Sequence, residues 1–178
     1  MKHKNFKTTI HGLFLIAALV CLIPSLSFAE DSKPCLKNPE VHQLDFWLGN
    51  WTITHNESAN RAQSKVYLSL DQCVVIEDWN NGAGHTGQNV LAYNSEEKQW
   101  VLLFADNFGH AHIFQGKTTP GMAEFNGTSH DSNGDMVLHK LKIVRKSENQ
   151  VEQTWEKSSD NGATWNTVFR GEYRRSQF

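Results

Sequence analysis

The stretch "GNWTITHN", residues 49–56, decides the fold of this chain. Within it Trp51 and Ile53 alternate with polar residues, the period of two that is typical of a strand with one buried face. Nine further segments downstream show the same alternation. Together the ten segments predict strands over residues 50–56, 65–70, 73–79, 88–94, 99–106, 110–116, 122–128, 136–146, 150–158 and 164–175.

Turn-forming residues separate these segments, as in "NNG" (80–82), "DNFG" (106–109) and "DNG" (160–162). About ten short strands follow one another, and no long helical pattern occurs after residue 48. Because closure removes the exposed edges of a sheet, we predict an all-β fold, a single up-and-down antiparallel β-barrel. A short N-terminal helix is expected within "PEVHQLDFWLG", residues 39–49.

The first 29 residues have the pattern of a secretory signal peptide. Three lysines precede an apolar run over residues 13–23, and small residues follow at a cleavage site ending in Ala29. This predicts a signal peptide over residues 1–29, a domain over residues 30–178, and a periplasmic or secreted location. The residue before Cys21 is not small, which argues against a lipid anchor, so we expect a mature chain without a transmembrane segment.

The charge and the cysteine content limit which partners and which cellular compartment the sequence allows. Three of the 17 basic residues leave with the signal peptide, so 14 remain against 19 acidic residues, a formal charge of −5. We therefore expect no nucleic-acid partner. Cys35 and Cys73 are the only cysteines left, and in an oxidising compartment they predict a disulfide bond; two free buried thiols are the alternative.

Two short motifs have a structural interpretation. "SSDNGATW", residues 158–165, resembles the Asp-box of sialidases, but it occurs once in a chain too short for a propeller. We interpret it as the turn before the last strand, with Asp160 capping the turn, Gly162 at positive φ and Trp165 beside it. "GAGHTG", residues 82–87, fits a dinucleotide fingerprint but precedes a strand rather than a helix, which indicates a hairpin at a barrel rim.

Gly49-Asn50-Trp51, between the short helix and the first strand, resembles the G-x-W signature of lipocalins and related calycins. The order of the motifs along nearly the whole mature chain is similar to exported bacterial lipocalin-like domains of uncharacterised function. The resemblance implies that Trp51 plugs the closed end of the barrel. It also implies that an arginine near the last strand packs across the indole, the candidates being Arg170, Arg174 and Arg175.

Two acidic residues are candidates for chemistry in the barrel. Glu77 shares one face of its segment with Val75 and Trp79, and Asp106 shares one with Phe104. If these faces point inward, desolvation raises the pKa of Glu77, which could then act as a general acid or hold a ligand. The alternative is that Glu77 pairs with a basic residue on a solvated face and Asp106 only begins a turn.

His110 and His112 lie two apart on a predicted strand, so both are expected on one face. Such a pair can bind a metal or haem iron if a third ligand, for which His55 is a candidate, faces it. The same pattern also fits an outward polar face with Ala111 and Ile113 inside. No spacing in the sequence identifies a metal site or a cofactor.

The sequence thus predicts a small-molecule-binding protein that holds an apolar or amphipathic ligand inside the barrel. The alternatives are a hydrolase or isomerase using Glu77 or Asp106, a haem- or metal-binding barrel, and a structural protein with a packed interior. No catalytic residue is assigned, and a homodimer through an exposed strand edge or apolar rim stays open. The predicted ligand-binding residues are Glu77, Trp79, Phe104, Asp106, His110, His112, Phe114 and Trp155.

Overall fold

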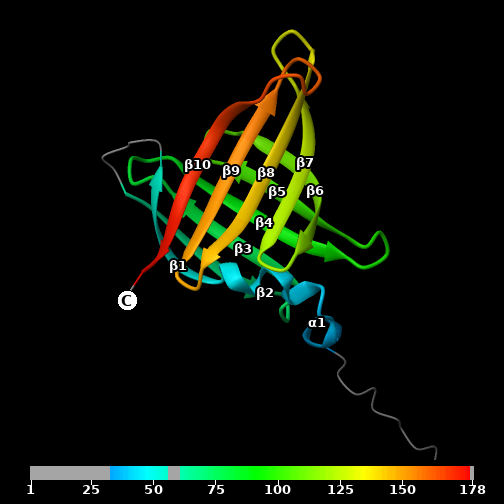
Figure 1. Cartoon of the computed structure of the whole chain (residues 1–178), viewed down its shortest axis with the longest axis vertical. Coiled ribbons are helices and arrows are strands. Elements are labelled where there is room, and N and C mark those ends of the chain that lie inside the picture. Colours follow the sequence, from blue (N-terminus) through cyan, green and yellow to red (C-terminus); the bar gives the residue numbers. More distant parts are fainter. Residues whose placement is uncertain (1–32, 56–60, 177–178) are drawn as a thin grey trace, which may run out of the picture. The chain divides into compact units, whose positions relative to one another are not determined.

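The alternating segments form ten antiparallel strands that close into one barrel in the order β1-β10-β9-β8-β7-β6-β5-β4-β3-β2 (Figure 1). This computed structural model describes residues 33–55 and 61–176, except for the side chain of His55. Each strand pairs with its neighbours in sequence, and β1 pairs with β10 to close the barrel. The strands are β1 (Gly49–His55), β2 (Ala62–Ser69), β3 (Val74–Asn80), β4 (Thr86–Asn94), β5 (Gln99–Asp106), β6 (Ala111–Thr119), β7 (Met122–His130), β8 (Met136–Ser147), β9 (Gln150–Ser158) and β10 (Asn166–Arg175).

The predicted all-β barrel and its ten strands are therefore confirmed, with shifts of a few residues at strand ends. β2 begins at Ala62 rather than at residue 65, and β6 begins at Ala111, which leaves His110 in the preceding turn. The predicted signal peptide and Cys21 lie outside the described residues, as does the side chain of His55, the candidate third metal ligand.

A short helical segment closes one end of the barrel. The predicted helix is the 3₁₀ helix η1 (Val41–Trp47), which buries Val41, Leu44 and Trp47, and the four-residue helix α1 (Pro34–Lys37) precedes it. Since η1 leads directly into β1, it lies at the end where β1 begins and β10 ends (Figure 1). The β7–β8 and β9–β10 loops lie at the opposite end.

Trp51 packs at the helix-covered end of the core. Its side chain is 1% exposed, and its indole Nε1 donates a hydrogen bond to the Trp47 carbonyl oxygen at 2.8 Å. Of the three candidate arginines, Arg175 covers the indole, with its guanidinium carbon 4.5 Å from the ring centroid. Arg175 also donates to the Leu48 carbonyl oxygen at 2.9 Å.

Gly49 makes this arrangement possible. It has a φ of 132°, and a Cβ atom built on it would lie 2.3 Å from Nη1 of Arg175. Any larger residue would therefore push the guanidinium away from Trp51. The spacing of Gly49 and Trp51 thus has a physical reason in this chain. Gly49 leaves space for the Arg175 guanidinium, and Trp51 provides the ring on which the guanidinium packs.

The predicted disulfide bond joins Cys35 and Cys73, whose Cα atoms are 5.1 Å apart. It links α1 to the turn between β2 and β3 across 38 positions of sequence. A loop of this size contributes about 4 kcal/mol in the chain-entropy model of disulfide stabilisation. The bond therefore holds the segment that leads into η1 against the barrel wall.

Both motifs with a structural interpretation form hairpin turns. The Asp160 carboxylate accepts hydrogen bonds from the Thr164 backbone N–H at 2.8 Å and hydroxyl at 2.5 Å, in the turn between β9 and β10. Gly162 has a φ of 90°, and its carbonyl oxygen accepts a hydrogen bond from the Trp165 indole. The "GAGHTG" stretch contains the β3–β4 turn and leads into β4, so both interpretations are confirmed.

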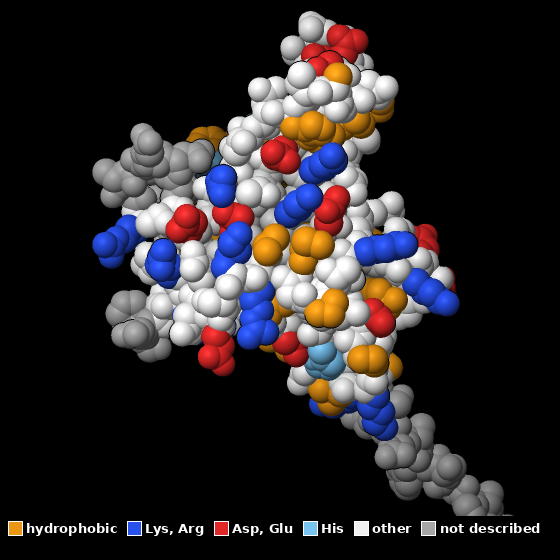
Figure 2. All heavy atoms as spheres, in the orientation of Figure 1, with side chains coloured by type: hydrophobic (Ala, Val, Ile, Leu, Met, Phe, Trp, Pro, Cys, Tyr) orange, Lys and Arg blue, Asp and Glu red, His pale blue; other side chains and the backbone are white. Residues whose placement is uncertain are grey.

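Basic and acidic side chains are interspersed on the outer face seen in Figure 2. Several form cross-strand pairs, including Lys142 with Glu124, and Arg170 and Lys146 with Glu152. Among the described residues, no helix is both long and apolar enough to cross a bilayer.

Candidate functional site

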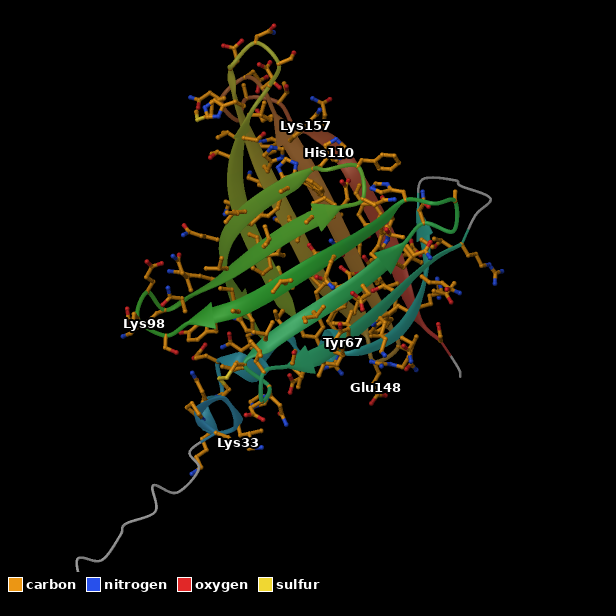
Figure 3. All side chains as sticks on the ribbon, turned by 180° about the vertical axis from the view of Figure 1, so that it is seen from behind. Lys33, Tyr67, Lys98, His110, Glu148 and Lys157 are labelled. Carbon is orange, nitrogen blue, oxygen red and sulfur yellow. A yellow bond between two sulfur atoms is a disulfide. The ribbon has the colours of Figure 1, made fainter. Side chains whose placement is uncertain are left out.

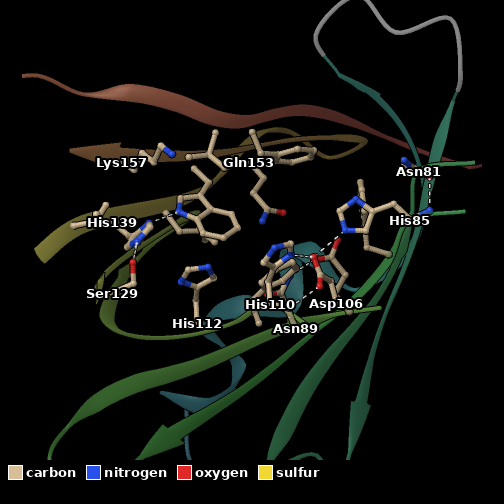
Figure 4. Close-up of a pocket in the computed structure, with 18 of the residues that line it drawn as sticks. Asn81, His85, Asn89, Asp106, His110, His112, Ser129, His139, Gln153 and Lys157 are labelled. Carbon is tan, nitrogen blue, oxygen red and sulfur yellow. Dashed lines mark hydrogen bonds and ion pairs between the residues drawn. The ribbon is translucent and has the colours of Figure 1, made fainter. Parts of the chain in front are cut away.

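A cavity of about 600 Å³ lies inside the barrel at the end opposite η1. Its mouth is formed by the β3–β4, β5–β6 and β7–β8 hairpins, and its walls by inward-facing side chains (Figure 4). The volume suits one small organic molecule. The lining residues are Glu77, Trp79, Asn81, His85, Asn89, Phe104, Asp106, His110, His112, Ser129, His130, Asp131, Val137, His139, Leu141, Gln153, Trp155, Lys157, Val168, Phe169 and Tyr173.

Glu77 is fully buried on the inner face of β3, between Val75 and Trp79 on the same face. Its carboxyl oxygens lie 2.7 Å from the Ser64 hydroxyl and 2.7 Å from the Asn89 amide nitrogen. Desolvation raises the pKa of Glu77, and it outweighs the hydrogen bonds from its neighbours, which lower the pKa. The inward alternative for Glu77 is therefore the one that the barrel adopts.

Tyr173 completes this buried network. Its hydroxyl lies 3.0 Å from Oε1 of Glu77 and 2.6 Å from Oε1 of Gln153. A phenol has one proton, so donation to Gln153 leaves the phenol oxygen free to accept a proton from Glu77. A neutral Glu77 therefore fits the geometry, in agreement with the direction of its pKa shift.

The opposite wall is built from aromatic and imidazole rings on β5, β6, β8 and β9. His139 stands 4.9 Å from His112 and 5.7 Å from Trp155, measured between ring centroids. An indole N–H can only donate, so the 3.0 Å contact from Trp155 Nε1 makes Nδ1 of His139 an acceptor. The proton of His139 is then on Nε2, which donates to the Ser129 hydroxyl oxygen at 2.8 Å.

The neutral state of His139 makes stability depend on pH. Desolvation, together with the nearby His112 and Lys157, lowers the pKa of His139 from 6.5 to about 4. Between these values the unfolded chain takes up a proton that the folded protein does not. Stability present above pH 6.5 should therefore be lost as the pH falls to about 4, by about 2 kcal/mol from this group.

We expect urea unfolding of the wild type and of His139→Gln to show this as a difference in free energy that shrinks with falling pH. His130→Gln, the same change at an exposed histidine, is the control and should follow the wild type. A difference between the wild type and His139→Gln that stays constant from pH 7 to pH 4 would contradict the assignment.

Asp106 organises the rim. Its Oδ2 lies 3.0 Å from His85 Nε2 and 2.9 Å from His110 Nδ1, and its Oδ1 accepts the backbone N–H groups of Phe108 and His110. Burial opposes ionisation of this carboxyl, but the hydrogen bonds from His110, His85 and the backbone outweigh it and lower its pKa. Asp106 thus both begins the predicted turn and holds two imidazoles at the cavity mouth.

Three cavity-lining residues have a buried polar atom without a hydrogen-bond partner among the described residues: Nε1 of Trp79, Oδ1 of Asn89 and Nδ1 of His112. Unpaired buried polar atoms are costly, so their concentration around one cavity needs a reason. Water or polar atoms of a ligand in the cavity would supply the missing partners after small side-chain movements.

Seven of the eight predicted ligand-binding residues line the cavity: Glu77, Trp79, Phe104, Asp106, His110, His112 and Trp155. Phe114 does not; it belongs to the buried core of the barrel, where its ring packs on His139 and Trp155.

His110 and His112 both line the cavity, but the prediction that they lie on one strand is wrong, because β6 begins at Ala111. His110 lies in the turn, bonded to Asp106, whereas His112 points into the barrel and Ile113, at 63% exposed, points out. The described residues contain no group of three or more His, Cys, Asp or Glu side chains arranged to hold a metal ion.

Sequence reasoning missed several lining residues, among them Asn89, His139, Gln153, Lys157 and Tyr173. Each lies on a correctly predicted strand and lines the cavity, Lys157 at its exposed mouth. Their importance comes from partners on other strands, which alternation does not identify.

These features define the class of the fold: a closed ten-stranded antiparallel β-barrel, capped at one end by a helix and with a cavity open at the other. No protein-family model and no curated protein matches the chain by sequence. Among 11 matching chains of solved structures is "Structure of EF1p2_mFAP2b bound to DFHBI", at 12% identity and a TM-score of 0.34, covering 77% of this chain and 99% of that one. The fold class rests on the strand pairing of this chain itself.

Proposed function

We propose that this protein binds one small amphipathic molecule in its barrel cavity and acts outside the cytoplasm. The cavity carries the proposal: about 600 Å³ of space has aromatic walls and polar atoms that lack partners among the described residues. A protein with a purely structural barrel would gain stability by filling this space and pairing these atoms. Keeping them costs stability, which a binding function explains.

The Cys35–Cys73 disulfide supports a location in the periplasm or outside the cell, because such bonds persist in oxidising compartments. The signal-peptide pattern over residues 1–29 points the same way and belongs to this proposal. We therefore propose that residues 30–178 form the mature, exported protein.

Glu77 favours a second candidate function, an enzyme that uses a neutral carboxyl as a general acid. Its pKa is raised, and it lines the floor of the cavity. Asp106 does not suit this role, because two imidazoles and two backbone N–H groups hold it in the ionised form. Against acid catalysis, both oxygens of Glu77 are already within hydrogen-bond distance of protein groups.

A cavity-filling variant tests the binding function. Val137 lines the cavity, so Val137→Trp should occupy the space and weaken binding of the neutral fluorescent probe N-phenyl-naphthylamine by at least about tenfold. Ile113→Trp adds the same side chain on the outer face and should leave binding unchanged. Fluorescence titration of the mature chain measures both. Equal probe affinity in the two variants, or no binding by the wild type, would remove the cavity from the proposal.

A further inference from the structure

The cavity has two chemically different polar ends, seen in Figure 4. Asn81, His85, Asp106 and His110 lie at one end, and Ser129, His139 and Lys157 lie at the other. At the first end the carboxylate of Asp106 is matched by two imidazoles. At the second end Lys157 lines the cavity without a carboxylate partner among the described residues.

The cross-strand register places Lys157 at this end. Lys157 on β9 is directly opposite His139 on β8 and lines the cavity two residues beyond Trp155, where its side chain is exposed at the mouth. Figure 3 shows Lys157 at the same end of the barrel as His110, away from Tyr67 and Glu148. The charge of Lys157 also contributes to lowering the pKa of His139, which agrees with their proximity.

None of the other charged groups that line the cavity forms an ion pair with Lys157 among the described residues. Asp131 lines the mouth, but its Oδ1 accepts the backbone N–H groups of Asn133 and Asp135, and it forms no ion pair with Lys157 within the described part of the chain. Glu77 is held in its own network on the floor. Within the described part of the chain, the cavity thus presents an ammonium group that has no ion-pair partner, with Asp131 as the other charged residue at this side of the mouth.

Ser129 adds a hydrogen-bond donor to the same wall. Its oxygen accepts the Nε2 proton of His139, because Nδ1 of that ring accepts from Trp155, so the hydroxyl hydrogen of Ser129 is available. An ammonium and a hydroxyl donor next to an aromatic surface form a site for an oxyanion attached to an apolar body. Trp155 provides that surface at the adjacent inward position of β9.

We infer that the ligand is an amphipathic carboxylate, an inference that rests on the proposed binding function. Its head group binds Lys157 and the Ser129 hydroxyl at the β7–β9 side of the mouth. Its apolar part extends along Trp155 and Phe104 toward the floor of the cavity. Lys157 is then the residue that selects acids over uncharged molecules of the same shape.

Two matched probes test this inference: dansylaminoundecanoic acid and its methyl ester, which differ only in the head group. The wild type should bind the acid more tightly than the ester. Lys157→Gln should weaken binding of the acid by about tenfold, the effect of losing one charge-assisted hydrogen bond, and leave binding of the ester unchanged. Lys157→Arg, which keeps the charge, should restore most of the preference.

Lys142→Gln is the matched control, because it removes the same charge from a lysine paired with Glu124 on the outer face. Equal binding of acid and ester by the wild type, or an equal effect of Lys142→Gln and Lys157→Gln, would overturn the carboxylate site while the binding function stands. Binding of neither probe by the wild type would instead count against the binding function itself, and the inference would fall with it.

Discussion

Replacing Trp51 by alanine is expected to lower the free energy of unfolding by about 4 kcal/mol. The indole is 1% exposed and fills the helix-covered end of the core, so its removal leaves a cavity between η1 and the strands. The change also removes the hydrogen bond to the Trp47 carbonyl oxygen and the ring under the Arg175 guanidinium. Urea unfolding followed by circular dichroism measures the loss.

Trp165→Ala is the matched control, since it removes the same side chain from the β9–β10 turn, where Lys140 covers the ring on the outside. We expect it to cost about 1 kcal/mol. If the two alanine variants lost equal stability, Trp51 would not be the plug of this barrel. The spacing of Gly49 and Trp51 would then lose its physical reason as well.

Two substitutions at Glu77 should have very different effects. Glu77→Leu leaves Ser64 and Asn89 without their hydrogen-bond partner in the interior and should cost about 3–5 kcal/mol. Glu77→Gln keeps the shape and places one oxygen toward Asn89 and one amide N–H group toward Tyr173, so it should stay within about 1 kcal/mol of the wild type.

The difference in stability between Glu77→Gln and the wild type should depend on pH. The folded-state pKa of Glu77 is raised above 4.5, so the contribution of its neutral form is fully present below pH 4.5 and is lost as the pH rises through the folded value. Glu77→Gln cannot ionise, so its stability relative to the wild type should increase with pH above 4.5. A relative stability that stays flat or falls over that range would mean that Glu77 is ionised at little cost in the folded protein.

Local patterns predicted much of the fold and part of the site. Alternation identified ten strands, and it placed Glu77 on one face with Val75 and Trp79, which is the inner face of β3. Alternation placed His110 on β6, but the Asp106 carboxylate accepts hydrogen bonds from its backbone N–H and its ring in the preceding turn, so β6 begins one residue later than expected.

Local sequence patterns could not identify which residues contact one another across the barrel. Tyr173 reaches Glu77 over 96 positions of sequence, and Arg175 could not be distinguished from two other arginines until β10 was paired with β1. Phe114 is an aromatic residue on the inner face of β6, but it lies in the buried core, because the side chains of neighbouring strands, among them His139 and Trp155, pack over it.

By itself the sequence determined the strands, their turns and the disulfide pair, because alternation, turn chemistry and a count of two cysteines are properties of neighbouring residues or of composition. Only the tertiary structure decided which groups share the cavity: the buried carboxyl of Glu77, the oriented ring of His139 and the ammonium of Lys157, which has no ion-pair partner among the described residues. The physical reason is that the register of the strands and the closure of the barrel decide which side chains come together. A shift of one residue in the register of a strand would send each of its side chains to the opposite face.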